Sequence, residues 1–296
     1  MRIALISLAA VVLAACGQQP SNTEPAAPAA TPAETPAAAT PVAAPVAADA
    51  LQQVLAGSWR DPANTARDAW RHPEQTLGFF QIQPSMRVIE ITPGGGWYTE
   101  ILAPWLAPQG QYVGALIDPA SSSSERARSY YSESNQKLRD KLAAQPDQYG
   151  KAELVEFSLT EPRFGEPASA DAVLTFRNVH NWINAGAAPG MFKGFFAVLK
   201  PGGVLGVVEH RANSDVPEGD RSGYMSEQQV IAMATAAGFV LEEKSEINAN
   251  PADTKDHPNG VWTLPPGNRH DEADRAKYQA IGESDRMTLR FRKPLG

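Results

Sequence analysis

The chain has 296 residues, of which 43% are hydrophobic and 20% charged, an ordinary balance for a globular protein. Its 26 basic and 33 acidic residues give a formal net charge of −7. This charge argues against a nucleic-acid partner, because phosphate binding needs a basic surface. The single cysteine excludes a disulfide within the chain, and it excludes zinc or iron–sulfur sites built from several cysteines.

The first fifteen residues have the features of an export signal. Arg2 supplies a positive charge, and residues 3–15 are apolar or small apart from Ser7. A run of this length is too short to span a membrane as a helix and is typical of the core of a signal peptide. We therefore expect residues 1–15 to be a signal peptide.

The signal ends in Leu-Ala-Ala-Cys, with the only cysteine at position 16. This ending resembles that of bacterial lipoprotein signals, in which the cysteine is acylated and becomes the first residue of the mature protein. The resemblance implies a membrane partner, reached through a lipid on Cys16. Gly17, in place of an aspartate, implies the outer membrane of the cell envelope, facing the periplasm. The alternative is an ordinary export signal followed by a chance cysteine.

Residues 16–50 are expected to be a disordered tether. Between positions 17 and 50 the chain has 13 alanines and 7 prolines, and prolines at this spacing prevent a continuous helix. Few side chains there can build a core, so the segment would hold the folded part away from a membrane. The remaining residues, 51–296, are expected to form a single domain.

Helical and strand patterns alternate along this folded part. Apolar spacing and capping signals, including the capping-box pair Ser226 and Gln229, predict helices over residues 47–56, 62–70, 73 onward, 97–106, 121–144, 189–199 and 226–237. Short apolar or alternating runs predict strands over residues 87–91, 111–117, 152–157, 171–176, 204–209, 240–247 and 287–292.

This order indicates an α/β fold built on a doubly wound, seven-stranded and mostly parallel sheet. Residues 51–83 would be helices that precede the first strand. The last two strands have no helical crossover between them, so they are expected to lie side by side as an antiparallel pair. Residues 248–285 then form a long insertion before the last strand, and loops of such length are usually functional.

A glycine turn between a strand and a helix is the strongest chemical signal. The first predicted strand runs directly into Thr92, Pro93, Gly94, Gly95 and Gly96. A cofactor that packs against a helix N-terminus needs close approach of the backbone, which glycine allows. The alternative is a purely structural tight turn.

With this turn in place, the chain resembles the class I S-adenosylmethionine-dependent methyltransferases over roughly residues 84–292. More closely, it resembles a family of exported bacterial proteins known only as predicted methyltransferases. The stretches that carry the closer resemblance are residues 67–73, 90–100, 250–258 and 281–287. The resemblance implies a Rossmann-like methyltransferase fold and S-adenosylmethionine as cofactor. A shared fold is weaker evidence for the activity than for the architecture, because one fold can host many reactions.

The resemblance also implies which residues contact the cofactor. Glu90, Gly94 and Gly96 match the acidic and glycine positions of the cofactor loop, while Thr92 stands where the pattern has its first glycine. Thr92 and Pro93 could narrow the pocket. The remaining cofactor candidates are Gly95, Trp97, Asn178 and Asp118. Asp118 follows the second strand and is the candidate for the ribose hydroxyls; the alternative is a solvated loop aspartate.

The segment after the fourth strand should face the substrate. His180 lies there and is the candidate catalytic residue, as a general base on a hydroxyl or amine. Asn178 and Asn181 flank it and could fix its tautomer. Trp182 could form an apolar or cation-stacking wall. The alternative is a histidine that only hydrogen-bonds its own loop.

Three other histidines are candidate substrate residues. His210 follows the fifth strand, His72 lies in the N-terminal helices, and His257 lies in the insertion, whereas His270 is expected to be solvated. No two histidines stand at helical metal-ligand spacing, so we predict no metal site. Residues 283–286 are expected to form an ion-paired turn or to reach the pocket.

Three functions remain open at this stage. The first is a methyltransferase acting on a small molecule or a cell-envelope component, although its donor is made in the cytoplasm. The second is a non-catalytic ligand-binding lipoprotein that reuses the fold, which the departures at Thr92 and Asp118 favour. The third is an envelope interaction protein that uses the insertion as a contact surface.

Overall fold

The computed structural model describes residues 44–122 and 124–296, and these described residues form one compact unit. The predicted signal peptide, Cys16 and most of the tether lie outside the described residues. The first helix, α1 (Ala44–Leu55), begins inside the segment predicted as tether. Within the described part of the chain, no helix combines the length and apolar character that crossing a membrane requires.

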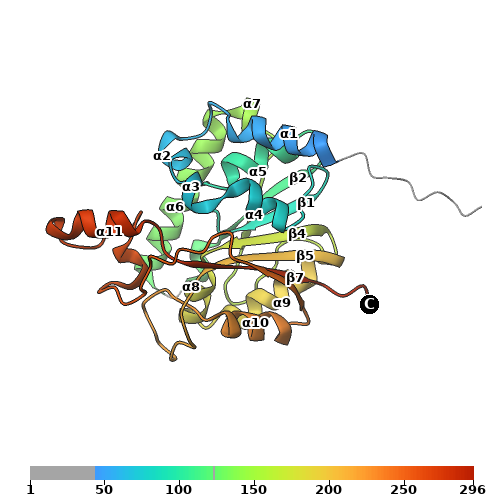
Figure 1. Ribbon diagram of the computed structural model, residues 1–296. Coiled ribbons are helices and arrows are strands. Elements are labelled where there is room, and N and C mark those ends of the chain that lie inside the picture. Colours follow the sequence, from blue (N-terminus) through green and yellow to red (C-terminus); the bar gives the residue numbers. More distant parts are fainter. Residues whose placement is uncertain (1–43, 123) are drawn as a thin grey trace, which may run out of the picture. The chain divides into compact units, whose positions relative to one another are not determined.

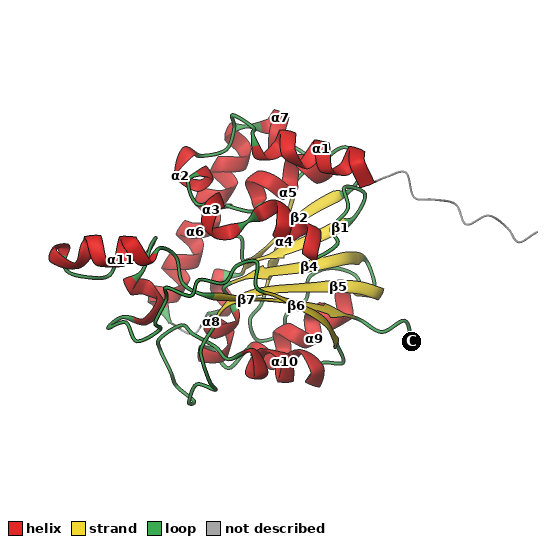
Figure 2. Ribbon diagram, in the orientation of Figure 1, coloured by secondary structure: helices red, strands yellow, loops and turns green. Residues whose placement is uncertain are grey.

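A seven-stranded sheet forms the centre of the unit (Figure 2). Its strands are β1 (Arg87–Ile91), β2 (Gln111–Ile117), β3 (Glu153–Phe157), β4 (Ala170–Phe176), β5 (Leu199–His210), β6 (Val240–Ser245) and β7 (Arg286–Arg292). Their order across the sheet is β3-β2-β1-β4-β5-β7-β6. Strand β7 runs antiparallel to both β5 and β6, while the pairs from β3 to β5 are parallel. The predicted α/β class and the antiparallel last pair are confirmed.

Helices cover both faces of this sheet (Figure 1). Before β1 lie α2 (Pro62–Thr65), α3 (Asp68–Arg71) and α4 (Pro73–Phe79); the later helices are α5 (Thr99–Leu106), α6 (Glu125–Ala144), α7 (Pro146–Tyr149), α8 (Val179–Asn184), α9 (Ala188–Val198), α10 (Glu227–Ala236) and α11 (Arg275–Ile281). In Figure 1, α1, α4 and α5 lie on one side of the sheet and α8, α9 and α10 on the other. Two hydrophobic clusters fill these layers, one centred on Phe192 and Phe195 of α9 and the other on Ile101 and Leu102 of α5.

Three local predictions differ from the structure. The helix predicted over residues 62–70 is two short helices, since α2 ends at Thr65 and α3 begins at Asp68. The segment after β4, treated as a loop, begins a helix, α8, at Val179. The insertion contains α11 and two short 3-10 helices, one at Gly260–Thr263. The capping box of Ser226 with Gln229 at the start of α10 is confirmed.

Candidate functional site

A cavity of about 550 Å³ opens at the carboxyl ends of β1, β2, β4 and β5. This is the edge at which open α/β sheets bind ligands, and the volume is in the range of small-molecule sites. Its walls come from the glycine turn, from the start of α8, from α3 and from the insertion. Because β7 is antiparallel, its first residue, Arg286, lies at the same edge, opposite His210 of β5.

The glycine turn forms one wall with its backbone. An added Cβ on Gly94 or Gly95 would meet nothing within 4 Å, so both residues face open space. Gly94 and Gly96 have φ values of 59° and 80°, which favour glycine. Thr92 adopts the same left-handed region, with φ of 51°, although it is a threonine. Its buried hydroxyl has no hydrogen-bond partner among the described residues.

Glu90, at the start of this turn, is a buried carboxyl group. Its Oε2 accepts hydrogen bonds from the Tyr112 hydroxyl (2.7 Å) and from Thr99 Oγ1 (3.1 Å). Burial raises the pKa of Glu90 to about 7, and these two hydrogen bonds oppose the rise only in part. Glu90 therefore changes its charge near neutral pH at the edge of the cavity.

The other predicted cofactor residues occupy different positions. Trp97 lines the cavity, and its indole N–H donates to the Asn64 carbonyl (2.8 Å). Asn178 also lines it, and its amide donates to the Ile91 carbonyl (3.0 Å), which joins the ends of β4 and β1. Asp118 does not line the cavity; its Oδ1 caps a short 3-10 helix by accepting from Ala120 N (2.9 Å). Its ribose role stays a prediction.

His180 is positioned by a buried carboxylate that the sequence analysis missed. Glu209, at the end of β5, is fully buried, and its Oε1 lies 3.1 Å from His180 Nδ1. A carboxylate accepts, so Nδ1 carries a proton, and in the neutral form of the ring Nε2 holds the lone pair. Asn178 and Asn181 were expected to fix this tautomer, but Glu209 holds Nδ1, and no hydrogen bond joins either asparagine side chain to the His180 ring among the described residues.

Glu209 also accepts three backbone N–H groups. These come from Val179 (2.6 Å), His180 (3.3 Å) and His210 (2.8 Å). The first two belong to the start of α8, so the carboxylate satisfies the exposed amides of that helix. Glu209 thus holds α8 and the imidazole of His180 together.

His210 lies beside His180, with ring centroids 5.5 Å apart, and its Nδ1 is 2.5 Å from the Ser284 hydroxyl. Burial first, and then the neighbouring His180 and Arg286, lower the pKa of His210 well below its ordinary value. His210 therefore enters the cavity as a neutral imidazole at physiological pH.

One ligand atom each from His180, Glu209 and His210 lie within 4.8 Å of one another, a grouping that could hold a metal ion. Spacing along a helix could not reveal this trio, because His180 lies at the start of α8 whereas Glu209 and His210 end β5. Both Glu209 oxygens already accept hydrogen bonds, and positive arginines surround His210. These contacts disfavour a cation, and the absence of a metal stays a prediction.

Two candidate substrate histidines lie elsewhere. His72 adopts φ of 41° between α3 and α4 and does not line the cavity, whereas Arg67 and Arg71 beside it do. His257 is held within the insertion by Asp253, with Nε2 2.8 Å from Oδ1, and does not line the cavity either. The cavity therefore does not include these two histidines, and their contact with a substrate stays a prediction.

Aromatic side chains contribute from both the core and the insertion. Trp182 reaches the cavity wall, but its ring is 1% exposed and packs against Phe192 and Phe195. Trp262, which the sequence analysis did not single out, lines the cavity 5.9 Å from the His180 ring. The insertion is thus part of the site.

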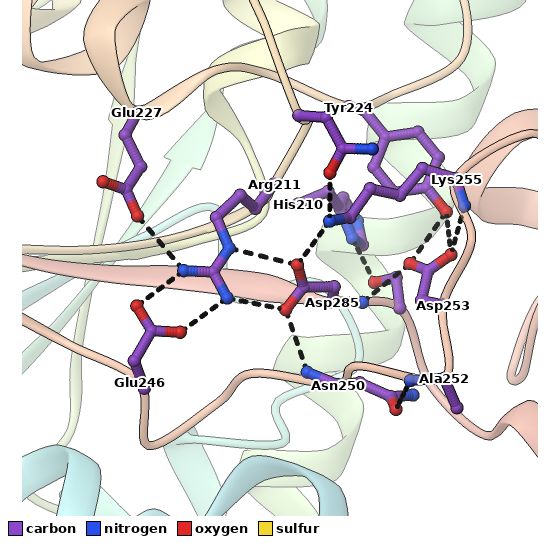
Figure 3. Close-up of polar contacts among 12 residues, drawn as sticks. His210, Arg211, Tyr224, Glu227, Glu246, Asn250, Ala252, Asp253, Lys255 and Asp285 are labelled. Carbon is purple, nitrogen blue, oxygen red and sulfur yellow. Dashed lines mark hydrogen bonds and ion pairs between the residues drawn. The ribbon is translucent and has the colours of Figure 1, made fainter.

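An ion-pair network anchors the insertion to the sheet (Figure 3). The Arg211 guanidinium, just beyond β5, binds Asp285 through two hydrogen bonds of 3.0 and 2.9 Å and Glu246 through two of 2.7 Å. Asp253, within the insertion, accepts from the Tyr224 hydroxyl (2.9 Å) and the Asp285 backbone N–H (2.7 Å). The contacts of Asp253 are buried and tie the insertion to the residue before β7.

Residues 283–286 form an ion-paired turn and also reach the cavity, so both readings of this segment hold. Glu283 is 2% exposed and accepts from Arg67 Nε (2.5 Å), Arg71 Nε (3.2 Å) and Arg286. Burial alone would raise the pKa of Glu283, but the surrounding guanidiniums outweigh it and hold the pKa well below its ordinary value. The carboxylate is therefore ionised within a positive cluster.

Comparison with known proteins gives the fold. No family model matches the chain, and no curated protein matches it. Among solved structures, the cyclase SpnF aligns with 83% of this chain and 93% of its own, at 16% identity and a TM-score of 0.51. The seven-stranded sheet is the Rossmann-like methyltransferase fold.

Two further matches carry methyltransferase names. An S-adenosylmethionine-dependent methyltransferase from Aquifex aeolicus aligns with 83% of this chain and 98% of its own, at 14% identity and a TM-score of 0.48. An arsenic(III) S-adenosylmethionine methyltransferase from Chlamydomonas reinhardtii aligns with 71% of this chain and 64% of its own, at 18% identity and a TM-score of 0.43. Since the fold is shared with a protein named as a cyclase, fold alone does not fix the reaction.

The local geometry accommodates an adenosyl ligand. The open space over Gly94 and Gly95 allows close approach to the backbone, and the Thr92 hydroxyl offers a buried polar group without a partner among the described residues. Asn178 and Trp97 line the same cavity next to this turn. Thr92 therefore does not prevent the left-handed backbone that the glycine of the family pattern would adopt.

Proposed function

We propose that the chain is an S-adenosylmethionine-dependent methyltransferase that acts on a small molecule or a cell-envelope component. The observation that carries the proposal is the open backbone of Gly94 and Gly95, which faces a cavity of about 550 Å³ at the carboxyl end of β1. Bound at this turn, S-adenosylmethionine supplies a methyl group on a sulfonium sulfur.

The acid–base part of the proposal rests on His180. Glu209 holds the proton on Nδ1, which leaves Nε2 to take a proton from an acceptor hydroxyl or amine. Neutral His210 and Trp262 lie beside His180 and complete this wall of the cavity. In this proposal the aromatic and histidine side chains position the acceptor, and positioning supplies much of the rate in a direct transfer.

Calorimetric titration with S-adenosylmethionine tests the cofactor site. Gly95 is the position to change, because an added side chain there projects into open space without the backbone strain expected at Gly94, where φ is 59°. We expect Gly95→Leu to abolish or strongly weaken binding. The matched control is Gly78→Leu on α4, where the added side chain also meets nothing but lies outside the cavity. Equal affinity in folded Gly95→Leu protein would refute the cofactor site.

A second candidate function is ligand binding without methyl transfer. It is favoured by SpnF, which shares the fold and is named as a cyclase rather than as a methyltransferase. Incubation with S-adenosylmethionine and a panel of small hydroxyl, amine and carboxylate acceptors separates the two. Formation of S-adenosylhomocysteine that depends on the acceptor supports transfer, whereas binding without turnover across the panel supports the second function.

The proposed setting is the outer membrane, facing the periplasm, with a lipid on Cys16 as the anchor. This part rests on the sequence alone, namely the apolar run that ends in Leu-Ala-Ala-Cys and is followed by Gly17. In that setting the domain would meet envelope components, and its donor would have to cross the inner membrane.

A further inference from the structure

Four arginines and one glutamate line the cavity and lie close to one another. They are Arg67, Arg71, Arg177, Arg286 and Glu283. These five residues carry four positive charges and one negative charge, a net charge of three positive; Glu90 also lines the cavity and offsets part of this charge when it is ionised. Arg71 and Arg286 are 4% and 2% exposed, so this charge is held largely away from water. Holding like charges together in a buried site costs free energy unless a counter-charge arrives.

Glu283 does not satisfy the hydrogen-bonding capacity of this cluster. It accepts only the Nε of Arg67 and the Nε of Arg71, together with one terminal nitrogen of Arg286. Arg67 Nη2 and Arg286 Nε are buried without a hydrogen-bond partner among the described residues. An arginine fork offers five N–H donors, so most of this capacity is left for something else.

Arg177 is the clearest unmet donor. It follows β4 with φ of 62°, in the left-handed region that arginine rarely adopts, and its backbone N–H donates to the Val208 carbonyl (2.7 Å). Burial first, and then the charge of Arg286, lower the pKa of Arg177 to about 10. No side-chain hydrogen bond of its guanidinium to another described residue opposes this. A strained backbone that presents an unpaired charge to a cavity is typical of a functional site.

We propose that these arginines bind an oxyanion, a carboxylate or a phosphoryl group, carried by the methyl acceptor. Guanidinium groups match both oxyanions through paired hydrogen bonds. The inference rests on the proposed function, since it assigns a class of acceptor to that site. The acceptor would hold its anion on the arginines and its nucleophile toward His180, which lines the same cavity.

The carboxylate of the donor is a less suitable ligand for the arginine cluster than an anionic acceptor. S-adenosylmethionine carries a sulfonium and an ammonium group beside its one carboxylate, so its net charge is positive. An excess of three positive charges would repel those two groups while attracting the third. The same excess opposes a metal cation, and it already contributes to the low pKa of His210.

Inorganic phosphate and acetate, titrated separately by calorimetry at constant ionic strength, test the anion site. We expect binding by the wild-type protein and a loss of about tenfold or more in Arg177→Gln. Arg177→Lys should lose part of the affinity, because lysine keeps the charge but not the fork. Arg163→Gln, which removes an exposed surface arginine, is the matched control and should bind as the wild type does. The probe that binds more tightly shows whether the site prefers a phosphoryl group or a carboxylate.

Folding is checked in the same variants. Because Arg177 makes no side-chain hydrogen bond to a described residue, Arg177→Gln should keep or raise the thermal midpoint in the absence of ligand. Arg67→Gln, at a partly exposed member of the cluster, provides a second variant and should also weaken phosphate binding. No binding of either probe by the wild-type protein up to about 10 mM, a weak-affinity limit, would overturn the proposal.

Binding of two nucleosides shows whether the arginines bind the acceptor or the carboxylate of the donor. S-adenosylhomocysteine has the amino-acid group, and 5′-methylthioadenosine lacks it. The proposal expects Arg177→Gln to leave the affinity for both nearly unchanged. A loss confined to S-adenosylhomocysteine would assign the arginines to the donor carboxylate and overturn the proposal. Phosphate binding by a wild-type protein that binds neither nucleoside would instead refute the methyltransferase function, and the acceptor assignment with it, while the anion site would stand.

Discussion

Replacing Glu90 by glutamine should make the folded protein more stable at alkaline pH and remove much of its pH dependence near neutrality. Glu90 is 3% exposed, and both of its side-chain hydrogen bonds are accepted by one oxygen, Oε2. The amide oxygen of glutamine can accept the same two bonds from Tyr112 and Thr99. Glu90→Gln therefore changes the charge of a buried group while leaving its shape and its partners in place.

The magnitude follows from the pKa. Burial raises the pKa of Glu90 to about 7 in the folded protein, whereas an unfolded glutamate titrates near 4.3. Between these values the folded state binds more protons, so its stability falls as pH rises. At about 1.4 kcal/mol per pKa unit, ionised Glu90 costs the folded state roughly 2–4 kcal/mol above pH 7. Below about pH 4.3 both states are protonated and the cost is absent.

Urea unfolding at about pH 5, 6, 7 and 8 measures this difference, provided that the transition is two-state. We expect Glu90→Gln to be more stable than the wild-type protein by only about 1 kcal/mol at pH 5 and by about 2–4 kcal/mol at pH 8. Glu133→Gln, on the exposed face of α6, removes the same charge without burial and should show no such trend. A constant difference from pH 5 to 8, or a variant that becomes less stable as pH rises, would refute the reasoning.

The remaining predictions concern three other sites. His180→Ala should lower the rate of methyl transfer by about 10²–10⁴ with donor affinity nearly unchanged, and an unchanged rate on a true acceptor would remove His180 from the mechanism. Glu209→Gln should lower the rate and the thermal midpoint together, because Glu209 supports both the imidazole and α8. Thr92→Gly should keep or raise stability by up to about 1 kcal/mol, since glycine relieves a left-handed threonine, and a clear loss in urea unfolding would contradict this. Cys16→Ser should release the protein from membranes or leave it unprocessed; membrane-bound protein of mature size would contradict lipid anchoring.

The candidate site was predictable from sequence where its residues are adjacent in the chain. Gly94, Gly95 and Trp97 follow β1 directly, and His180 follows β4, so a strand and its succeeding turn identify them. Glu209 was missed although it ends β5, because its role depends on contact with α8 from another part of the chain. The arginine cluster was missed for the same reason. Glu283 was noticed as a turn residue, but its partners Arg67 and Arg71 lie more than 200 residues away in the chain.

The sequence by itself determined the alternation of helices and strands, the bounds of β1 and β2, the capping box of α10 and the glycine turn. Each of these follows from apolar spacing, capping or backbone freedom within a few residues. The tertiary structure decided what faces the cavity. Strand pairing sets His210 opposite Arg286. The N-terminal helices pack against the segment before β7, and this packing places Glu283 among the arginines. Such contacts depend on pairing and burial between distant segments, which no local pattern encodes.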